Sequence, residues 1–547
     1  MTQRVYLSTT IPYVNARPHL GHALEFVQAD VLARHRRLAG DQVRFQTGTD
    51  DNSLKNVLAA EAEGIAVAAL VDRNAAAFGA LREPLALSFD DVIRTSSDPR
   101  HRPGVERLWQ ACAASGDLYR KHYEGRYCVG CEQFYHLADL PGGLCPEHGT
   151  APEPVAEENW FFRLSRYAGQ LHDLISSGRL RIEPAARRNE VLGFISGGLE
   201  DFSASRSTAR AHGWGIPVPG DPGQVIYVWW DALGNYITAL GYGTDAASYR
   251  KWWAAADRRV HLAGKGVLRF HAVYWPAILL SAGEPLPTHI LVHDYLTIGG
   301  RKISKSRAPG AGTDPVPLLD RYGADAVRWW LLREVPRLGD ADFTPARLVA
   351  RANDDLANDL GNLVSRVVTL VHRYRRGRVP QAAGPGSRDE AGRALAGALR
   401  QGPPRVAAAL DAFDFRSALA AIWAVVEEAN RYVERAEPWH LARAEREGDA
   451  EAGQRLDECL ALLIATCSEL GRELAPFVPG LAARIQAACD GSAGPLPPAR
   501  PVFPRIEPPR ADVSARRRRP AADKLGEPVG APESRAADRA SSPPGDY

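Results

Sequence analysis

The chain has 547 residues, too many for one ordinary domain, and suggests roughly three to four domain-sized units. Hydrophobic residues make up 45% and charged residues 24%, as in soluble globular proteins. The 67 basic and 65 acidic side chains leave a net charge of +2, which neither requires nor excludes a nucleic-acid partner. No apolar run approaches the roughly 20 residues of a membrane span, and no secretory signal pattern opens the chain. Seven cysteines are too few for a disulfide scaffold in a chain of this length. We therefore expect a cytoplasmic protein.

The first residues alternate between strand and helix patterns. Residues 4–9 and 42–48 have the character of short buried strands, and helices are expected over 20–39 and 54–63. This alternation predicts a parallel, Rossmann-like sheet in an α/β domain.

The middle of the chain interrupts and then resumes this pattern. Residues 116–225 are rich in Gly and Pro and contain clustered cysteines, so they are predicted to be an insertion that splits the α/β domain into 1–115 and 226–350. Further buried strands are expected at 225–233, 259–264 and 289–296.

Beyond residue 350 the composition changes to Ala, Leu and Arg at helical spacing. Residues 351–505 are predicted to form an all-α helical bundle, with long amphipathic helices over 352–376 and 412–442. The last segment, 506–547, is rich in Arg, Pro, Ala and Ser and is predicted to be a disordered tail.

The tetrapeptide HLGH follows the first strand and opens the first helix. Gly21 permits close approach of a ligand to the backbone, and the helix N-terminus offers free N–H groups to an anion. His19 and His22 are three residues apart and face the same way, so they are placed to contact phosphate oxygens. Alone the motif is weak, because two histidines at a helix start are commonly structural.

The heptapeptide RKISKSR at 301–307 crowds positive charges around two serines. Lys302 and Lys305, with the hydroxyls of Ser304 and Ser306, suit a polyphosphate. A solvated basic loop is the alternative explanation when the motif is considered alone. Ile303 is expected to be an apolar anchor in its centre.

Together, HLGH and KISKS resemble the class I aminoacyl-tRNA synthetases, which contact one ATP from both sides. The blocks TTIPYVNARPHLGH, QTGTDD, YCVGCEQFY, VWWDALGNY, FHAVYWPA and NRYVERAEPW narrow the resemblance to the methionyl-tRNA synthetase family over nearly the whole chain to about residue 505. The resemblance implies ATP with Mg²⁺ as substrate, methionine and tRNA(Met) as partners, and catalytic roles for His19, His22, Lys302 and Lys305. It also implies that His19, Gly21, His22, Lys302, Ser304, Lys305 and Ser306 bind ATP.

The same resemblance implies a methionine pocket. Its expected members are Ile11, Tyr13, Asp50, Trp229, Ala232, Leu233, Tyr236, Val267 and His271. Asp50 suits the substrate ammonium, and the aromatic and apolar residues suit a flexible thioether. Core packing is the alternative for any one of these aromatic residues.

Two knuckles indicate a metal site. Cys128 and Cys131 form one C-x-x-C pair, and Cys145 with His148 forms a C-x-x-H pair thirteen residues later. Four such ligands with no open position predict one structural tetrahedral Zn²⁺ within 128–148. The remaining cysteines, Cys112, Cys459, Cys467 and Cys489, are expected to be buried small apolar residues.

A possible RNA-reading surface lies in the helical region. Asn362 and Arg366 share one helix face, and Trp439 ends NRYVERAEPW. The family resemblance implies that they read the anticodon, by hydrogen bonding to base edges and by stacking. Without it, a surface pair and a packed Trp explain them equally well.

Four departures from the family pattern fall in the nucleotide half of the site. Asn52 and Ser53 replace His and Gly, Gly266 replaces an Asp, Asp294 replaces a Gly, and Ile303 replaces a Met. One hypothesis is that Asp294 partly supplies the carboxylate missing at Gly266.

The main interpretation is a methionine–tRNA ligase. Two alternatives remain: a tRNA-binding regulator with weak catalysis, and an adenylating enzyme that acylates an acceptor other than tRNA. No appended dimerisation module is recognised, so a monomer is expected.

Overall fold

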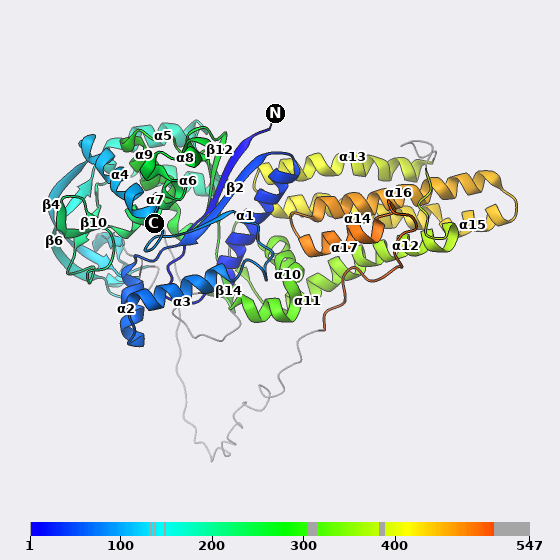
Figure 1. Cartoon of the computed structure of the whole chain (residues 1–547), viewed down its shortest axis with the longest axis horizontal. Helices are drawn as coiled ribbons and strands as arrows, with labels where there is room; N and C mark the ends of the chain where they lie inside the picture. The colour runs from blue at the N-terminus through cyan, green and yellow to red at the C-terminus, as the bar shows by residue number, and fades with distance from the viewer. Residues whose placement is uncertain are drawn as a thin grey trace, which may run out of the picture. The chain divides into compact units, whose positions relative to one another are not determined.

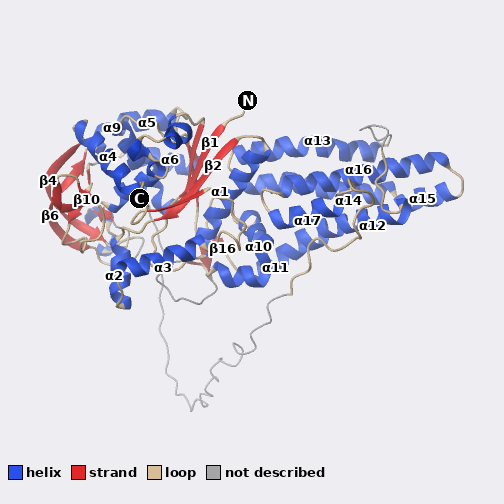
Figure 2. Cartoon of the chain, in the orientation of Figure 1, coloured by secondary structure: helices blue, strands red, loops and turns tan. Residues whose placement is uncertain are grey.

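The computed structural model describes residues 2–130, 133–135, 137–146, 149–303, 314–381 and 389–507. Strands and helices share the first two thirds of the chain, and the described elements from α11 (Pro345–Arg351) onward are helices (Figures 1 and 2). This is the predicted α/β region followed by an all-α region. None of the helices in the described residues combines the length and apolarity of a membrane span. The predicted tail lies outside the described residues from 508 onward.

A six-stranded, wholly parallel sheet forms the centre of the α/β part. Its spatial order is β3-β2-β1-β12-β13-β7. The strands are β1 (Arg4–Thr9), β2 (Gln42–Thr49), β3 (Asp91–Arg94), β7 (Arg181–Glu183), β12 (Arg258–Gly264) and β13 (His289–His293). From β1 the chain winds to β2 and β3 on one side, and β12 and β13 lie on the other. The carboxyl ends of β1 and β12 therefore flank a topological switch point, where α/β sheets bind ligands.

Helices lie between these strands or follow the last of them in the chain. They are α1 (Leu20–Leu38), α2 (Leu54–Glu63), α3 (Val67–Gly79), α4 (His101–Ala114), α7 (Val228–Thr238), α9 (Trp275–Ala282) and α10 (Pro315–Arg333). The expected helices 20–39 and 54–63 are present. The expectation of a strand over 225–233 is wrong, because β11 (Asp221–Ile226) ends early and α7 follows. Every residue of α7 is buried, and a continuous apolar run has no periodicity that separates helix from strand.

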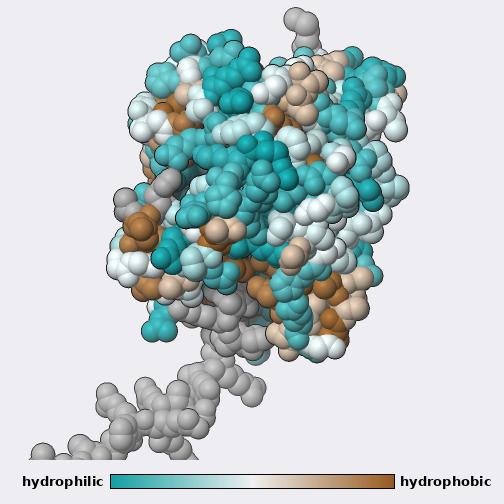
Figure 3. Space-filling view, turned by 90° about the vertical axis from the view of Figure 1, so that its left-hand side faces the viewer, coloured by the Kyte–Doolittle hydropathy of each residue, from teal (hydrophilic) through white to brown (hydrophobic). Residues whose placement is uncertain are grey.

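Antiparallel strands dominate the Gly- and Pro-rich stretch. A four-stranded sheet contains β5 (Gln133–Tyr135), β4 (Leu118–Cys128), β6 (Glu153–Phe162) and β8 (Phe202–Ser203), and a three-stranded sheet contains β10 (Pro217–Val218), β11 and β9 (Ser205–Ser207). The helices α5 (Ala168–Ser176) and α6 (Ala185–Ser196) lie between them in sequence. Between α5 and α6 the chain returns to the central sheet as β7, so the stretch 116–225 is not wholly separate from it. Hydrophilic residues cover most of the face over β4 and β6, with hydrophobic residues in small groups (Figure 3).

The C-terminal part is a bundle of long helices. They are α12 (Asn362–Arg375), α13 (Glu390–Asp411), α14 (Phe415–Ala436), α15 (Pro438–Arg446), α16 (Ala450–Leu474) and α17 (Pro479–Cys489). The helix expected over 352–376 begins as a π-helical segment, Ala352–Gly361, before α12. The helix expected over 412–442 is two helices, because Glu437 adopts a left-handed conformation (φ 43°) immediately before Pro438.

One buried arginine joins α1, α10 and the turn before α17. The Arg328 guanidinium donates hydrogen bonds to the carbonyl oxygens of Phe477 (2.7 Å), Pro476 (2.8 Å) and Leu85 (3.0 Å). It also lies 2.8 Å from the Asp30 carboxylate, and both side chains are fully buried. Burial alone would raise the pKa of Asp30. The positive charges of Arg328 and Arg34 outweigh burial and lower this pKa.

Candidate active site

A cavity of about 230 Å³ opens at the carboxyl ends of the central strands. Its walls come from the segments that follow β1, β2, β12 and β13 and from α1 and α7. It is lined by Thr10, Ile11, Pro12, Tyr13, His22, Glu25, Asp50, Trp229, Ala232, Leu233, Tyr236, Gly264, Gly266, Val267, His271 and Tyr295. This is the switch point between β1 and β12, so the sheet topology explains why segments distant in sequence meet here.

The cavity brings together the entire predicted methionine set. Ile11, Tyr13, Asp50, Trp229, Ala232, Leu233, Tyr236, Val267 and His271 all line it. The backbones of Tyr13 and Asp50 also form a parallel bridge, which ties the segments after β1 and β2 together.

Aromatic rings build one wall. The ring of Trp229 stacks on Phe270, with centroids 3.8 Å apart and planes 6° apart, and the ring of Tyr13 meets Trp229 edge-on at 6.2 Å. Phe270 was not predicted as a site residue, although it lies within the quoted block FHAVYWPA. Stacking holds the indole in one orientation, which gives the cavity a rigid apolar surface.

His271 and Tyr236 are fixed by hydrogen bonds. His271 Nδ1 lies 2.9 Å from the Val267 carbonyl oxygen, and Nε2 lies 2.7 Å from the Tyr236 hydroxyl. A carbonyl only accepts, so Nδ1 carries the proton and Nε2 accepts from the phenol. Burial lowers the pKa of His271, which keeps the ring neutral beside the apolar wall.

Two buried carboxylates line the cavity. Asp50 is 2% exposed, and its Oδ1 accepts from the Asn52 N–H at 3.3 Å. Glu25 was missed by the sequence reasoning. Its Oε1 accepts from the N–H and hydroxyl of Thr10, both at 2.6 Å, and its Oε2 lies 2.8 Å from His293 Nε2. The sequence contained one signal for Glu25 as a site residue: it is an acidic residue among the apolar positions of the predicted first helix, where charged side chains are rarely buried without a partner.

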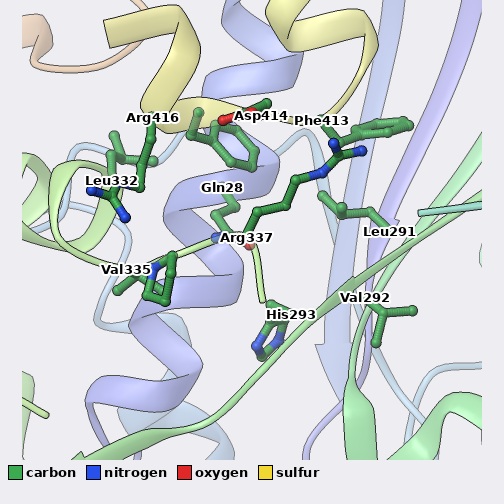
Figure 4. Close-up of a pocket in the computed structure, with 12 residues that line it drawn as sticks. Gln28, Leu291, Val292, His293, Leu332, Val335, Arg337, Phe413, Asp414 and Arg416 are labelled. Atoms are coloured by element: carbon green, nitrogen blue, oxygen red, sulfur yellow. The ribbon is translucent and has the colours of Figure 1, made fainter. Parts of the chain in front are cut away.

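A smaller pocket lies behind His293, between β13 and the start of α14 (Figure 4). Its volume is about 20 Å³, and Arg337, Phe413 and Arg416 are among its lining residues. That is room for about one water molecule, too little for a substrate. The larger cavity is therefore the candidate site, and His293 contacts its wall through Glu25.

The two histidines of HLGH have different positions. His22 lines the cavity, whereas His19 is the N-cap of α1 and does not. His19 Nδ1 accepts from the Gly21 N–H at 3.1 Å, and His22 Nδ1 accepts from the His19 N–H at 3.0 Å. The rings stack with centroids 3.8 Å apart. This reciprocal cap places the α1 N-terminus and the His22 imidazole at one edge of the cavity, with the His19 ring stacked on His22.

Lys302 reaches the cavity wall through Tyr295. Lys302 lies in β15 (Arg301–Lys302), and its Nζ is 3.6 Å from the centroid of the Tyr295 ring. The Nζ of Lys265 lies 4.6 Å from the same centroid and 2.7 Å from Asp340 Oδ1. Ile303 is buried, as expected for an anchor, but Ser304, Lys305 and Ser306 lie outside the described residues.

The missing side chain at Gly266 is explained by the position of Tyr295. A Cβ built on Gly266 would overlap the Tyr295 hydroxyl and lie 3.3 Å from its Cζ. The phenol therefore occupies the space that a larger residue at position 266 needs. Tyr295 was not predicted, because nothing in the sequence indicates that these two positions meet.

The other departures have local structural partners. Asn52 donates to Asp231 Oδ2 (2.7 Å), and the Ser53 hydroxyl accepts from the Lys55 N–H (3.0 Å) as the N-cap of α2. Asp294 does not replace the carboxylate missing at Gly266. It is buried, pairs with Arg187 and accepts from the Gly339 N–H at 2.5 Å, and it is not among the residues that line the cavity.

The predicted zinc ligands are only partly described. Cys128 ends β4 and Cys145 follows Leu144, and both are buried and outside any disulfide. The Cys145 Sγ lies 3.7 Å from the Tyr135 hydroxyl oxygen. Cys131 and His148 lie outside the described residues, and the described part of the chain contains no cluster of three or more metal ligands.

The three predicted anticodon residues are exposed on the helical bundle. Asn362 is the first residue of α12, and Arg366 lies one turn later on the same side. Trp439, near the start of α15, is 41% exposed, which is unusual for so large an apolar side chain. A packed core tryptophan is therefore excluded at this position.

Comparison with known proteins agrees with this geometry. The chain matches the family model described as class I tRNA synthetases (M) over residues 5–151 and 138–368, and the model of the anticodon binding domain of methionyl tRNA ligase over residues 379–498. The methionine–tRNA ligase of Brucella suis biovar 1 is 41% identical over 526 residues, which cover 92% of this chain and 98% of that protein. The corresponding enzyme of Mycobacterium bovis is 41% identical over 524 residues, with the same coverage.

A solved structure is similarly close. The crystal structure of Mycobacterium tuberculosis methionyl-tRNA synthetase bound by methionyl-adenylate has a TM-score of 0.84 to this chain at 38% identity. The match covers 92% of this chain and 100% of the other.

Proposed function

The chain belongs to the methionine-specific family of class I tRNA synthetases, and on this premise we propose that it is a methionine–tRNA ligase. In the first step the carboxylate of L-methionine attacks the α-phosphorus of ATP, methionyl-AMP forms, and pyrophosphate leaves. In the second step a ribose hydroxyl at the 3′ end of tRNA(Met) attacks the activated carbonyl, and AMP leaves. The observation that carries this proposal is the convergence of all nine expected methionine-binding residues on one cavity at the switch point of the sheet.

In this proposal the cavity binds methionine by charge at one end and apolar contact at the other. The Asp50 carboxylate accepts hydrogen bonds from the substrate ammonium. Trp229, held in place by its stack on Phe270, surrounds the thioether together with Leu233 and Val267, and the thioether is soft enough to fit an aromatic wall. His271 is neutral and hydrogen-bonded to Tyr236, so no charged group loses hydration when the thioether binds.

The nucleotide lies between the α1 N-terminus and the KISKS segment. His19, Gly21 and His22 are assigned to its phosphates on one side, and Lys302, Ser304, Lys305 and Ser306 on the other. Donors held in place before the reaction stabilise charge as it develops on the phosphate oxygens, without reorganisation during the step. The Mg²⁺ carried by ATP neutralises part of the phosphate charge.

A structural zinc ion fits the donor set of the knuckle region. Cys128 and Cys145 are buried and outside disulfides, and Cys131 with His148 completes four soft ligands. One zinc per chain is expected by elemental analysis of the purified protein. Cys128→Ser should lose the metal and lower the melting temperature, whereas Cys112→Ser, at a buried cysteine in α4, should keep it. A zinc-free wild type that melts at the same temperature as a zinc-loaded one would contradict this assignment.

The helical part, residues 351–505, is assigned to recognition of the tRNA anticodon. Asn362 and Arg366 present donors to base edges, and the exposed Trp439 ring offers a stacking surface. The catalytic part then comprises 1–115 and 226–350, with 116–225 as the inserted connective region. We assign the enzyme to the cytoplasm as a monomer.

The decisive test is ATP–pyrophosphate exchange across all amino acids, followed by charging of purified tRNA(Met). Exchange with methionine alone, together with charging, supports the proposal. Exchange without charging would instead identify an adenylating enzyme with another acceptor. Loss of exchange with every amino acid, in a protein that still binds tRNA(Met), would identify a tRNA-binding regulator.

A further inference from the structure

Two cysteines in the helical bundle face each other across the hairpin of α16 and α17. The two helices are joined by a short turn at 475–478, and their packing register is set by contacts one turn apart. Gln486 Nε2 donates to the Ser468 carbonyl oxygen at 2.6 Å, and a Cβ on Gly471 would lie 3.1 Å from Ile485 Cγ2. In this antiparallel register the next opposed pair is Cys467 and Cys489, and each thiol is close enough to shift the pKa of the other.

The backbone around this pair suits a covalent bridge. Gly471 lets the two helices approach closely one turn away, and a disulfide needs Cα atoms within about 7 Å. Cys489 is the last residue of α17, and the extended Asp490 follows it, so the helix ends at the position opposite Cys467.

Only one of the two thiols is within reach of solvent. Both cysteines are buried, but Cys467 is 0% exposed, whereas Cys489 is 6% exposed and lines a surface cavity of about 320 Å³ together with Ser468, Gln486, Ala487, Asp490 and Gly491. Hydrogen bonds from the Cys467 thiol and the Ser468 hydroxyl lower the pKa of Cys489, with burial acting in the opposite direction. The pKa of Cys467 is raised by the neighbouring Cys489 thiol and by burial. Cys489 is thus the thiol nearer to solvent, and Cys467 is the partner behind it.

We propose that Cys467 and Cys489 form a reversible, redox-sensitive disulfide, with Cys489 as the attacking thiol and Cys467 as the resolving thiol. The Cys489 thiolate attacks one sulfur of a low-molecular-weight disulfide, a mixed disulfide forms, and one small thiol leaves. Cys467 then loses its proton and attacks the Cys489 sulfur, which forms the intramolecular bond and releases the second small thiol. Two electrons pass from the cysteine pair to the small disulfide, and both protons end on the released thiols.

The bridge would fix α17, which also contacts the helix next to the KISKS segment. The Gly480 N–H donates to Asp325 Oδ1 of α10 at 3.1 Å, and Arg484 pairs with Asp325 at 2.9 Å. In reducing compartments such disulfides are transient and act as redox sensors. Oxidation is therefore expected to raise the denaturant midpoint of the helical bundle, and a reductant should reverse the shift.

The test uses the full-length protein treated with oxidised glutathione, blocked by alkylation and mapped by peptide mass spectrometry. The wild type should yield a linked Cys467–Cys489 peptide that a dithiol reductant removes. Cys467→Ser should accumulate a glutathione adduct on Cys489, because the resolving thiol is missing. Cys489→Ser should leave Cys467 unmodified.

Cys459→Ser is the matched control, because Cys459 is a buried cysteine of the same helix, and it should form the 467–489 bridge as the wild type does. Two results would overturn the proposal: recovery of both Cys467 and Cys489 as alkylated thiols after oxidation, or an adduct on Cys467 in the Cys489→Ser variant. The melting temperatures of Cys467→Ala and Cys467→Ser are compared with that of the wild type. This comparison shows whether a missing bridge reflects a loss of folding or only the loss of the resolving thiol.

Discussion

At the scale of single residues, we expect methionine affinity to depend most on Asp50. It is the buried carboxylate assigned to the substrate ammonium, and the asparagine amide that replaces it in Asp50→Asn cannot neutralise that charge. Loss of one partner of a buried charge pair costs about 2–5 kcal/mol, so kcat/KM for methionine should fall on the order of 10²-fold or more. Exchange kinetics against methionine concentration measure this loss. Asp72→Asn, at an exposed carboxylate on α3, is the control and should retain the wild-type value.

Gly266 and Tyr295 form a second residue-scale pair. Gly266→Ala should raise the KM for ATP, because its Cβ displaces the Tyr295 hydroxyl from the cavity wall. Removing that hydroxyl in the Gly266→Ala/Tyr295→Phe double variant leaves Cζ 3.3 Å from the Cβ, so part of the loss should be recovered. A double-mutant cycle on the KM for ATP measures the coupling. Additive effects of the two substitutions would show that the overlap is not responsible.

At the scale of elements, the buried Arg328 fixes how α10 and α1 meet the helical bundle. Arg328→Met removes the fully buried partner of Asp30, leaves Arg34 as its remaining counter-charge and removes the donor to three carbonyl oxygens, which costs about 3–5 kcal/mol of unfolding free energy. Urea unfolding checks the value. Arg34→Met, at the more exposed partner of Asp30, should cost less than half as much. A small loss in Arg328→Met would show that the turn at 476–477 is held by other contacts.

Element boundaries show where pattern reasoning succeeds. The helix over 20–39 and the strand over 42–48 were predicted correctly, although both are largely buried, because 19 residues is a length typical of helices and 8 residues is typical of strands. The fully buried α7 was mistaken for a strand, and β7 was assigned to the insertion although it pairs with β13. Both errors have the same cause: burial on all sides and long-range pairing leave no local pattern.

At the scale of the whole molecule, acid should destabilise the fold before most carboxylates titrate. Burial lowers the pKa of four histidines: His35, His261, His271 and His289, the last to about 4. The unfolded chain binds protons at these positions from about pH 6.5 downward, whereas the folded protein does not, so each contributes a loss of about 1.4 kcal/mol per pH unit until its folded pKa is reached.

His293 has the opposite sign but does not compensate in this window. Despite burial, Glu25 raises its pKa, so its stabilisation is fully present below about pH 6.5 and is lost only as the pH rises through the folded value. Urea unfolding between pH 7 and pH 5 should therefore show stability falling with pH. His261→Gln should flatten that slope, and His172→Gln, at an exposed histidine, should not. A slope that is the same in wild type and His261→Gln would contradict this account.

The sequence by itself determined the family, the α/β and helical halves, and the residues expected to bind methionine, because motif chemistry and hydrophobic period are local properties. Only the tertiary structure showed that these nine residues share one cavity, that His19 caps the helix while His22 lines the cavity, and that Asp294 turns away toward Arg187. It also revealed the contact between Gly266 and Tyr295 and the opposition of Cys467 and Cys489. Each of these pairings joins side chains from different elements, and such contacts arise from how strands and helices pack rather than from any pattern along the chain.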